Sequence, residues 1–264
     1  APANATYAIY LGTNGSTASS LTSSTGITLE SLNDTIGTIY LDGAVSLNGG
    51  TGDITLKAAV IGTSTTVHDI TTSGKVWLLP DAGQASFGSA LTTQYMNFVN
   101  ATGLTIGKDT NTTDVTLGNT HSIAGPITVY GGNINVNQNL ISTAANAAIL
   151  LKGQGNISLA SSKSITTNGG SVTFWADSNA DGTGYAQLYT SASVSTSGGA
   201  ITLGGGSDIA SGYARGEATR DLDSEPTYTL YTAGVHLRAG SSLTSSGGDI
   251  TLRGQNLNTS ASAM

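Results

Sequence analysis

Residues 126–159 read PITVYGGNINVNQNLISTAANAAILLKGQGNISL, and this stretch decides the fold. Four segments in it open with isoleucine and carry a second apolar residue two positions later, which is the pattern of a short strand with one buried side. These segments are residues 127–129, 134–136, 149–151 and 157–159. The anchors Ile134, Ile149, Ile157 and Val172 follow one another in steps of 15, 8 and 15 along the sequence. The repeat is therefore about 23 residues long and carries at least two strands.

The same pattern recurs along most of the chain, for example at Ile27, Ile54, Val115 and Ile250. A period of this order is the mark of a solenoid, and strands as the repeating element make it a parallel β-helix. We predict one all-β domain over residues 1–264, a right-handed parallel β-helix of roughly eight to ten coils. Isoleucines of successive coils should stack about 4.8 Å apart inside the tube. A β-sandwich is the alternative, but its strands lack such a regular 15-plus-8 spacing.

The composition narrows the functional classes. Among 264 residues there are 36 glycines and no cysteine, 9% are charged, and the net charge is −7. A disulfide scaffold is excluded, and an acidic chain is a poor ligand for nucleic acid. No apolar run approaches the roughly 20 residues of a transmembrane helix. A cysteine-free chain rich in Ser, Thr, Asn and Gly suits export, so we expect an extracellular or bacterial cell-surface location.

Two intervals exceed the repeat and predict insertions at about 177–188 and 208–231. The first contains Asp177, Asn179 and Asp181 followed by Gly182, the spacing of the first half of a calcium loop. Leu188 stands where such a loop has its bidentate glutamate. We predict a Ca²⁺ site at the two aspartates and the asparagine. The alternative is an Asx-rich turn that binds nothing.

The second insertion holds seven of the 25 charged residues and three tyrosines, which makes it a candidate binding surface. The alternative is a solvated loop that packs over the tube through its tyrosines. Outside the insertions, Lys57, Lys152, Arg238 and Arg253 each lie three residues after an apolar anchor and should point outward. Long basic side chains there would cover the rim and keep the tube soluble, or would form a stripe for an acidic glycan.

Catalysis finds little support in the sequence. The three histidines, His68, His121 and His236, fall in unrelated contexts. No nucleophile elbow, zinc-protease motif or phosphate-binding glycine loop is present. We therefore predict no catalytic residues and no enzymatic activity.

The strings SITTNGGSVTFWADS (164–178) and TSGGAITL (196–203) resemble the repeats of filamentous-haemagglutinin-type exoproteins, which are large bacterial adhesins often exported by two-partner secretion. The resemblance is clearest over residues 120–254. The family's secretion domain usually carries an Asn-Pro-Asn-Gly motif, which this chain lacks. The resemblance therefore implies stalk material and leaves the export route open.

Three functions follow as expectations. The first is a structural or adhesive rod, a stalk or passenger segment that stacks end to end on copies of itself or on further β-helix segments. The second is a glycan-binding or polysaccharide-cleaving β-helix with its site near the two insertions. The third is a surface binder with flat threonine faces, like ice binders, against which the changing outward residue types count.

Overall fold

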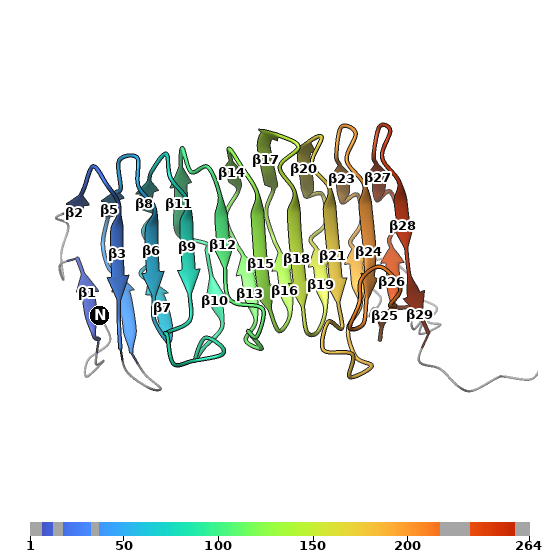
Figure 1. Ribbon diagram of the computed structural model, residues 1–264, viewed down its shortest axis with the longest axis horizontal. Helices are drawn as coiled ribbons and strands as arrows, with labels where there is room; N and C mark the ends of the chain where they lie inside the picture. Colours follow the sequence, from blue (N-terminus) through green and yellow to red (C-terminus); the bar gives the residue numbers. More distant parts are fainter. Residues whose placement is uncertain (1–6, 13–17, 33–36, 217–232, 257–264) are drawn as a thin grey trace, which may run out of the picture.

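The computed structural model describes residues 7–12, 18–32, 37–216 and 233–256. Its parallel strands stack as a β-solenoid, all-β and without a helix in the described residues, which confirms the predicted fold class (Figure 1). No described segment forms a helix of the length and apolarity that crossing a bilayer requires.

Each coil places one strand on each of three faces, where the sequence indicated at least two strands. Face 1 consists of β1 (Ile9–Leu11), β4 (Thr38–Leu41), β7 (Val60–Thr63), β10 (Leu91–Thr92), β13 (Val115–Leu117), β16 (Ile134–Val136), β19 (Ile157–Leu159), β22 (Ala186–Leu188) and β26 (Val235–Leu237). Face 2 consists of β2 (Ser19–Thr22), β5 (Val45–Asn48), β8 (His68–Thr71), β11 (Met96–Val99), β14 (His121–Ile123), β17 (Leu140–Ala145), β20 (Ser164–Asn168), β23 (Ser193–Ser195) and β27 (Ser242–Thr244).

Face 3 is one continuous nine-stranded sheet. It consists of β3 (Ile27–Glu30), β6 (Ile54–Lys57), β9 (Val76–Leu79), β12 (Leu104–Ile106), β15 (Ile127–Gly131), β18 (Ile149–Gly153), β21 (Val172–Ala176), β24 (Ile201–Gly205) and β28 (Ile250–Leu252). A further small pair joins β25 (Ala214–Arg215) to β29 (Gly254–Gln255). The chain thus runs through faces 1, 2 and 3 in turn.

Register along face 3 confirms the predicted stacking of anchors. Ile127 pairs with Ile149, which pairs with Val172, and all three side chains are buried inside the tube. These pairings advance the chain by 22 and then 23 positions, whereas the mean spacing is larger, about 26, because other coils carry extra residues. The coil length predicted from the repeat is therefore that of a coil without insertions.

The neighbour of Ile201 in the next coil is Ile250, whereas Val235 lies on face 1 and pairs with Ala186. The chain passes from Ile201 to Ile250 through Val235, and the predicted second insertion, residues 208–231, falls within this interval of the sequence; residues 217–231 lie outside the described residues.

Glycine has a steric role at the corner between faces 2 and 3. Glycine occupies the position two residues before the face 3 anchor in six of the nine coils, at Gly52, Gly74, Gly125, Gly170, Gly199 and Gly248. A Cβ atom on Gly170 would overlap the carbonyl oxygen of Ala147 in the preceding coil. Close stacking of the backbone therefore explains why glycine recurs before strands.

Candidate functional site

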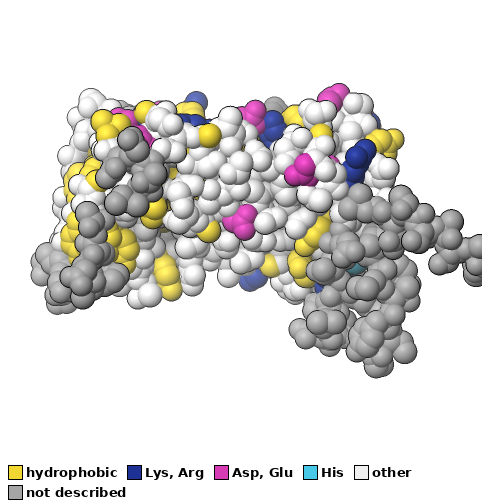
Figure 2. Space-filling view, turned by 90° about the horizontal axis from the view of Figure 1, so that it is seen from below, with side chains coloured by type: hydrophobic (Ala, Val, Ile, Leu, Met, Phe, Trp, Pro, Cys, Tyr) yellow, Lys and Arg dark blue, Asp and Glu magenta, His cyan; other side chains and the backbone are white. Residues whose placement is uncertain are grey.

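Extra residues collect at one corner of the tube, where face 3 leads into face 1. The connections at the other two corners have three to seven residues, but here they lengthen at residues 80–90, 107–114, 177–185 and 206–234. We call the described parts of these four segments the loop edge, which lies along the bottom of Figure 1. Figure 2 views the molecule from that side and shows charged side chains scattered over a polar surface. The sequence predicted insertions at about 177–188 and 208–231, whereas the loops at 80–90 and 107–114 were not predicted.

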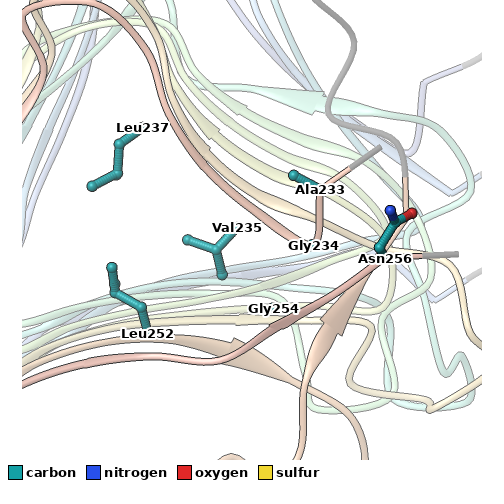
Figure 3. A pocket seen from close by; sticks show the side chains of 7 residues that line it. All are labelled: Ala233, Gly234, Val235, Leu237, Leu252, Gly254 and Asn256. Atoms are coloured by element: carbon teal, nitrogen blue, oxygen red, sulfur yellow. The ribbon is translucent and has the colours of Figure 1, made fainter. Parts of the chain in front are cut away.

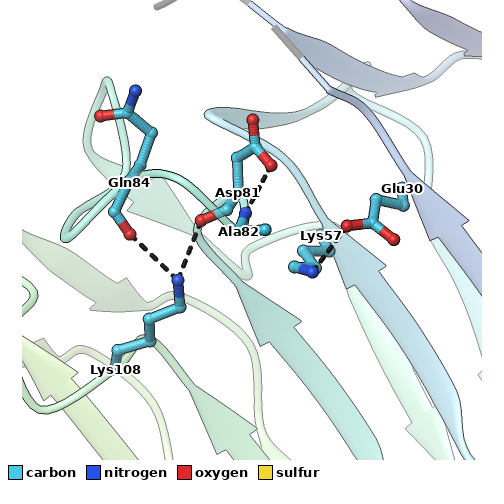
Figure 4. A network of polar contacts seen from close by, with 6 residues as sticks. All are labelled: Glu30, Lys57, Asp81, Ala82, Gln84 and Lys108. Carbon is cyan, nitrogen blue, oxygen red and sulfur yellow. Dashed lines mark hydrogen bonds and ion pairs between the residues drawn. The ribbon is translucent and has the colours of Figure 1, made fainter. Parts of the chain in front are cut away.

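Neighbouring loops of the loop edge are joined by hydrogen bonds. The Nζ atom of Lys108 donates to the carbonyl oxygens of Asp81 at 2.9 Å and Gln84 at 3.0 Å (Figure 4). The Oγ1 atom of Thr110 donates to the carbonyl of Ala85 at 2.8 Å. A lysine and a threonine of one coil thus satisfy backbone acceptors of the coil before it, so these loops stack as the strands do.

The predicted calcium residues come together in the loop between β21 and β22. The Nδ2 atom of Asn179 donates to Asp181 Oδ2 at 2.7 Å, and Asp177 Oδ1 accepts from the backbone N–H of Gly182 at 3.1 Å. The loop is shorter than predicted, since residues 186–188 form β22 and Leu188 is fully buried in the tube.

Charges in this loop influence one another. Burial and the nearby carboxylate of Asp181 raise the pKa of Asp177. The pKa of Asp181 is lowered, chiefly because its carboxylate accepts hydrogen bonds from Thr183. No group of three or more His, Cys, Asp or Glu side chains suited to a metal occurs among the described residues. The loop instead offers two carboxylates and one amide.

The second insertion is described as far as residue 216. Asp208 accepts from the backbone N–H of Ala210 at 2.9 Å and from Ser211 Oγ at 2.8 Å, and Tyr213 is exposed. Residues 217–231, which carry most of the predicted charged and aromatic binding surface, lie outside the described residues. That part of the prediction stays a prediction.

The four basic residues do not share one face, so a stripe through all four, which was the alternative to a soluble rim, does not form. Arg238 follows β26 of face 1, whereas the other three belong to the ends of strands on face 3. Lys57 forms an ion pair with Glu30 at 2.6 Å (Figure 4). Arg238 is 8% exposed and lies over the Tyr189 ring at 4.3 Å.

Lys152 lies where face 3 meets the loop edge. Its Nζ atom is 2.5 Å from Asp109 Oδ1 and 4.2 Å from the centre of the Trp175 ring. The indole Nε1 of Trp175 donates to the carbonyl of Gly206 at 2.6 Å. A cation, an acid and an aromatic ring from different coils therefore meet next to the calcium-loop residues.

The outer surface of face 3 carries a more regular threonine column than the sequence indicated. In register, its first outward positions are Thr28, Thr55, Trp77, Thr105, Thr128, Leu150, Thr173, Thr202 and Thr251. The tryptophan and the leucine interrupt it. The adjacent outward column mixes charged, aromatic and aliphatic residues, so this face is not the unbroken threonine surface that an ice-binder-like function requires.

The histidines are not brought together. His68 and His121 lie inside the tube on face 2, in β8 and β14, two coils apart. His236 lies on face 1, and its pKa is lowered by burial and by Arg238. No histidine constellation for acid–base chemistry thus forms in the described residues.

The last described coil exposes apolar residues whose counterparts in the preceding coil are buried. Leu237 is 38% exposed, and Ile250 and Leu252 are each 45% exposed. A hollow of about 370 Å³ lies at this end and is lined by Leu237 and Leu252 together with Val235 and Asn256, among others (Figure 3). At the opposite end the equivalent face 3 residues are at most 9% exposed. In the described part of the chain, the strand edges and the apolar interior are therefore open at the C-terminal end.

No protein-family model matches the chain, and no curated protein or solved structure is found to be similar. The stacked parallel strands place the chain in the class of β-solenoids.

Proposed function

We propose that the chain is a rod-forming segment of an extracellular bacterial surface or fibre protein, and that the rod extends by stacking coils end to end. The observation that carries this proposal is the open C-terminal coil, in which exposed apolar side chains and strand edges without a partner among the described residues occur together. Unpaired edges of parallel strands are templates for further strands. Exposed interior residues add the free energy of apolar burial to that pairing.

A second copy of the chain fits the open end through its first coil. The interior columns of face 3 end in Ile250 and Leu252 and begin with Ile27 and Leu29, so the columns would continue with the same residue types. Because Ile27 and Leu29 are at most 9% exposed, the apolar area newly buried in the contact would come mainly from the C-terminal end. A contact between one end and the other is heterologous, and such contacts build open filaments instead of closed dimers.

Charge at the two ends is also complementary. Arg253 directly follows the last strand of face 3, at the outward position that Glu30 occupies in the first strand. Within the chain, Lys57 already occupies the position next to Glu30 and pairs with it. An arginine of one copy would lie on the other side of the same carboxylate. The ends would thus continue a stacking that the interior of the rod already uses.

Sedimentation velocity over a wide concentration range and electron microscopy test the proposal. We expect the mean mass to rise with concentration and the rods to lengthen in units of one chain. Leu252→Asp should abolish association, because it places a charge among the apolar side chains of the end. Leu150→Asp, on the outer surface in the middle of face 3, is the matched control and should associate normally. A wild-type protein that stays monomeric at all concentrations would refute end-to-end stacking.

Glycan binding is a second candidate, supported by a polar groove on face 1. The groove has a volume of about 380 Å³ and is lined by Asn135, Asn137, Ser158 and Tyr189, among others. Amides and hydroxyls beside an aromatic ring can recognise sugars. A glycan array would test this function, and binding retained in Tyr189→Ala would remove the groove as its site.

A further inference from the structure

Asp177 carries a buried carboxylate oxygen without a partner. Its side chain is 1% exposed, and Oδ1 accepts the N–H of Gly182, which directs the carboxylate into the 177–183 loop. The other oxygen, Oδ2, is buried and has no hydrogen-bond partner among the described residues. A buried acceptor that is left unpaired costs about 1–3 kcal/mol, and more when it is charged. The fold thus holds a buried carboxylate of which one oxygen, Oδ2, has no compensating partner among the described residues.

A second carboxylate lies beside it. Asp181 is close enough to Asp177 to raise the pKa of the buried group, as burial also does. Two adjacent carboxylates are stable when they share a proton or when a cation lies between them. A divalent cation would compensate both charges and would supply the missing partner of Asp177 Oδ2.

The remaining oxygen donors follow the spacing of a calcium loop. Side chains of the first, third and fifth residues are Asp177, Asn179 and Asp181, and the sixth residue, Gly182, has φ 93°. In this motif glycine permits the sharp turn, and the backbone carbonyl of the seventh residue, here Thr183, is also a ligand.

We propose that this loop binds Ca²⁺ through the side chains of Asp177, Asn179 and Asp181 and the carbonyl of Thr183, with water in the remaining positions. An all-oxygen set that includes an amide and a carbonyl suits calcium better than magnesium, which requires a stricter octahedron. The glutamate of the twelfth position is absent, since Leu188 packs inside the tube. Binding should therefore fall in the weak range of extracellular modules, about 10⁻⁴–10⁻³ M.

Terbium luminescence tests the site, because Trp175 lies next to it. The indole donates to the carbonyl of Gly206, and the N–H of Gly206 donates to the carbonyl of Asp177 at 3.1 Å. We expect Tb³⁺ added to the purified protein to give saturable emission on indole excitation. Excess Ca²⁺ should displace Tb³⁺, and the same concentration of Mg²⁺ should not.

Variants locate the ion. Asp177→Asn and Asp181→Asn should each weaken Tb³⁺ binding at least tenfold, whereas Asp208→Asn, which changes an aspartate outside the loop, should leave it unchanged. Asp181 is exposed, so its variant decides the matter if the Asp177 variant does not fold. Absence of saturable emission from the wild type, displacement by Mg²⁺ as effective as by Ca²⁺, or binding unchanged in Asp181→Asn would overturn the proposal.

Discussion

Protonation of His121 should destabilise the solenoid in mild acid. The side chain is 1% exposed and lies inside the tube, with its ring centre 4.7 Å from that of Phe98. Its Nε2 atom lies 2.7 Å from Oγ1 of Thr93, which is itself fully buried, and its Nδ1 atom has no hydrogen-bond partner among the described residues. A second proton would place a charge in this apolar interior.

The size of the effect follows from the pKa. Burial lowers the pKa of His121 from 6.5 to about 4. Between these values the unfolded chain binds a proton that the folded chain does not, so stability is full above about pH 6.5 and falls as the pH decreases. At about 1.36 kcal/mol per pKa unit the full loss is about 3 kcal/mol, of which about 2 kcal/mol is lost between pH 7 and pH 5.

The pH-dependent contributions of other titratable groups to stability must be separated from that of His121. Burial lowers the pKa of His68 too, so it adds a loss in the same direction. The raised pKa of Asp177 acts in the opposite direction, because that side chain favours the fold when protonated and disfavours it as the pH rises. A comparison of wild type with a variant that lacks His121 cancels both contributions.

Urea unfolding at pH 7 and pH 5 measures the difference. The variant Thr93→Val/His121→Leu replaces both hydrogen-bonded partners with apolar groups, so it leaves no donor or acceptor of this pair unsatisfied. We expect wild type to lose about 2 kcal/mol more than this variant between the two pH values. Equal losses in both proteins, or an NMR titration that gives His121 a pKa near 6.5 in the folded state, would refute the reasoning.

Three further substitutions test the packing. Gly170→Ala should lower the free energy of unfolding by about 1–3 kcal/mol, because its Cβ overlaps the carbonyl of Ala147, and urea unfolding checks this. Phe174→Ala should cost about 3–5 kcal/mol in the same assay, since the ring is fully buried in the tube. Lys57→Ala should change stability by less than about 1 kcal/mol, because its ion pair with Glu30 is solvent-accessible, and a larger loss in thermal unfolding would contradict that.

The sequence predicted faces 1 and 3 and missed face 2, for a reason visible in the strands. On faces 1 and 3 most strands carry two apolar residues two positions apart, such as Ile157 and Leu159. On face 2, β23 and β27 each have one apolar residue, Val194 and Leu243, between polar ones. A three-residue strand with one inward side chain cannot show the alternation of apolar and polar residues that marks a strand in the sequence. Such a strand is recognised only from its pairing with the strands of neighbouring coils.

The candidate calcium site was likewise only partly predictable from the sequence. The spacing of Asp177, Asn179 and Asp181 was readable in the sequence, because a loop motif is local. Burial of the Asp177 oxygen was not, since it depends on backbone from other coils: Asp177 N–H donates to the carbonyl of Gly155, and the Asp177 carbonyl accepts from Gly206. Contacts between coils, which lie a full turn or more apart along the sequence, leave no short-range signal.

Stacking also explains why function should concentrate at the loop edge and at the open end. Interior positions must match the coil above and the coil below, and corners such as that at Gly170 leave no room for a side chain. The corner from face 3 to face 1 is the exception, because its length varies: two residues separate β6 from β7, eleven separate β9 from β10, and the connection from β24 to β26 is longer still. Insertions there do not disturb the stacked columns of interior side chains. The insertions nevertheless contact the loop of the neighbouring coil, as the hydrogen bonds of Lys108 and Thr110 show. A ligand bound at this edge would therefore contact several coils at once, and it would stabilise their stacking as well as occupy a site.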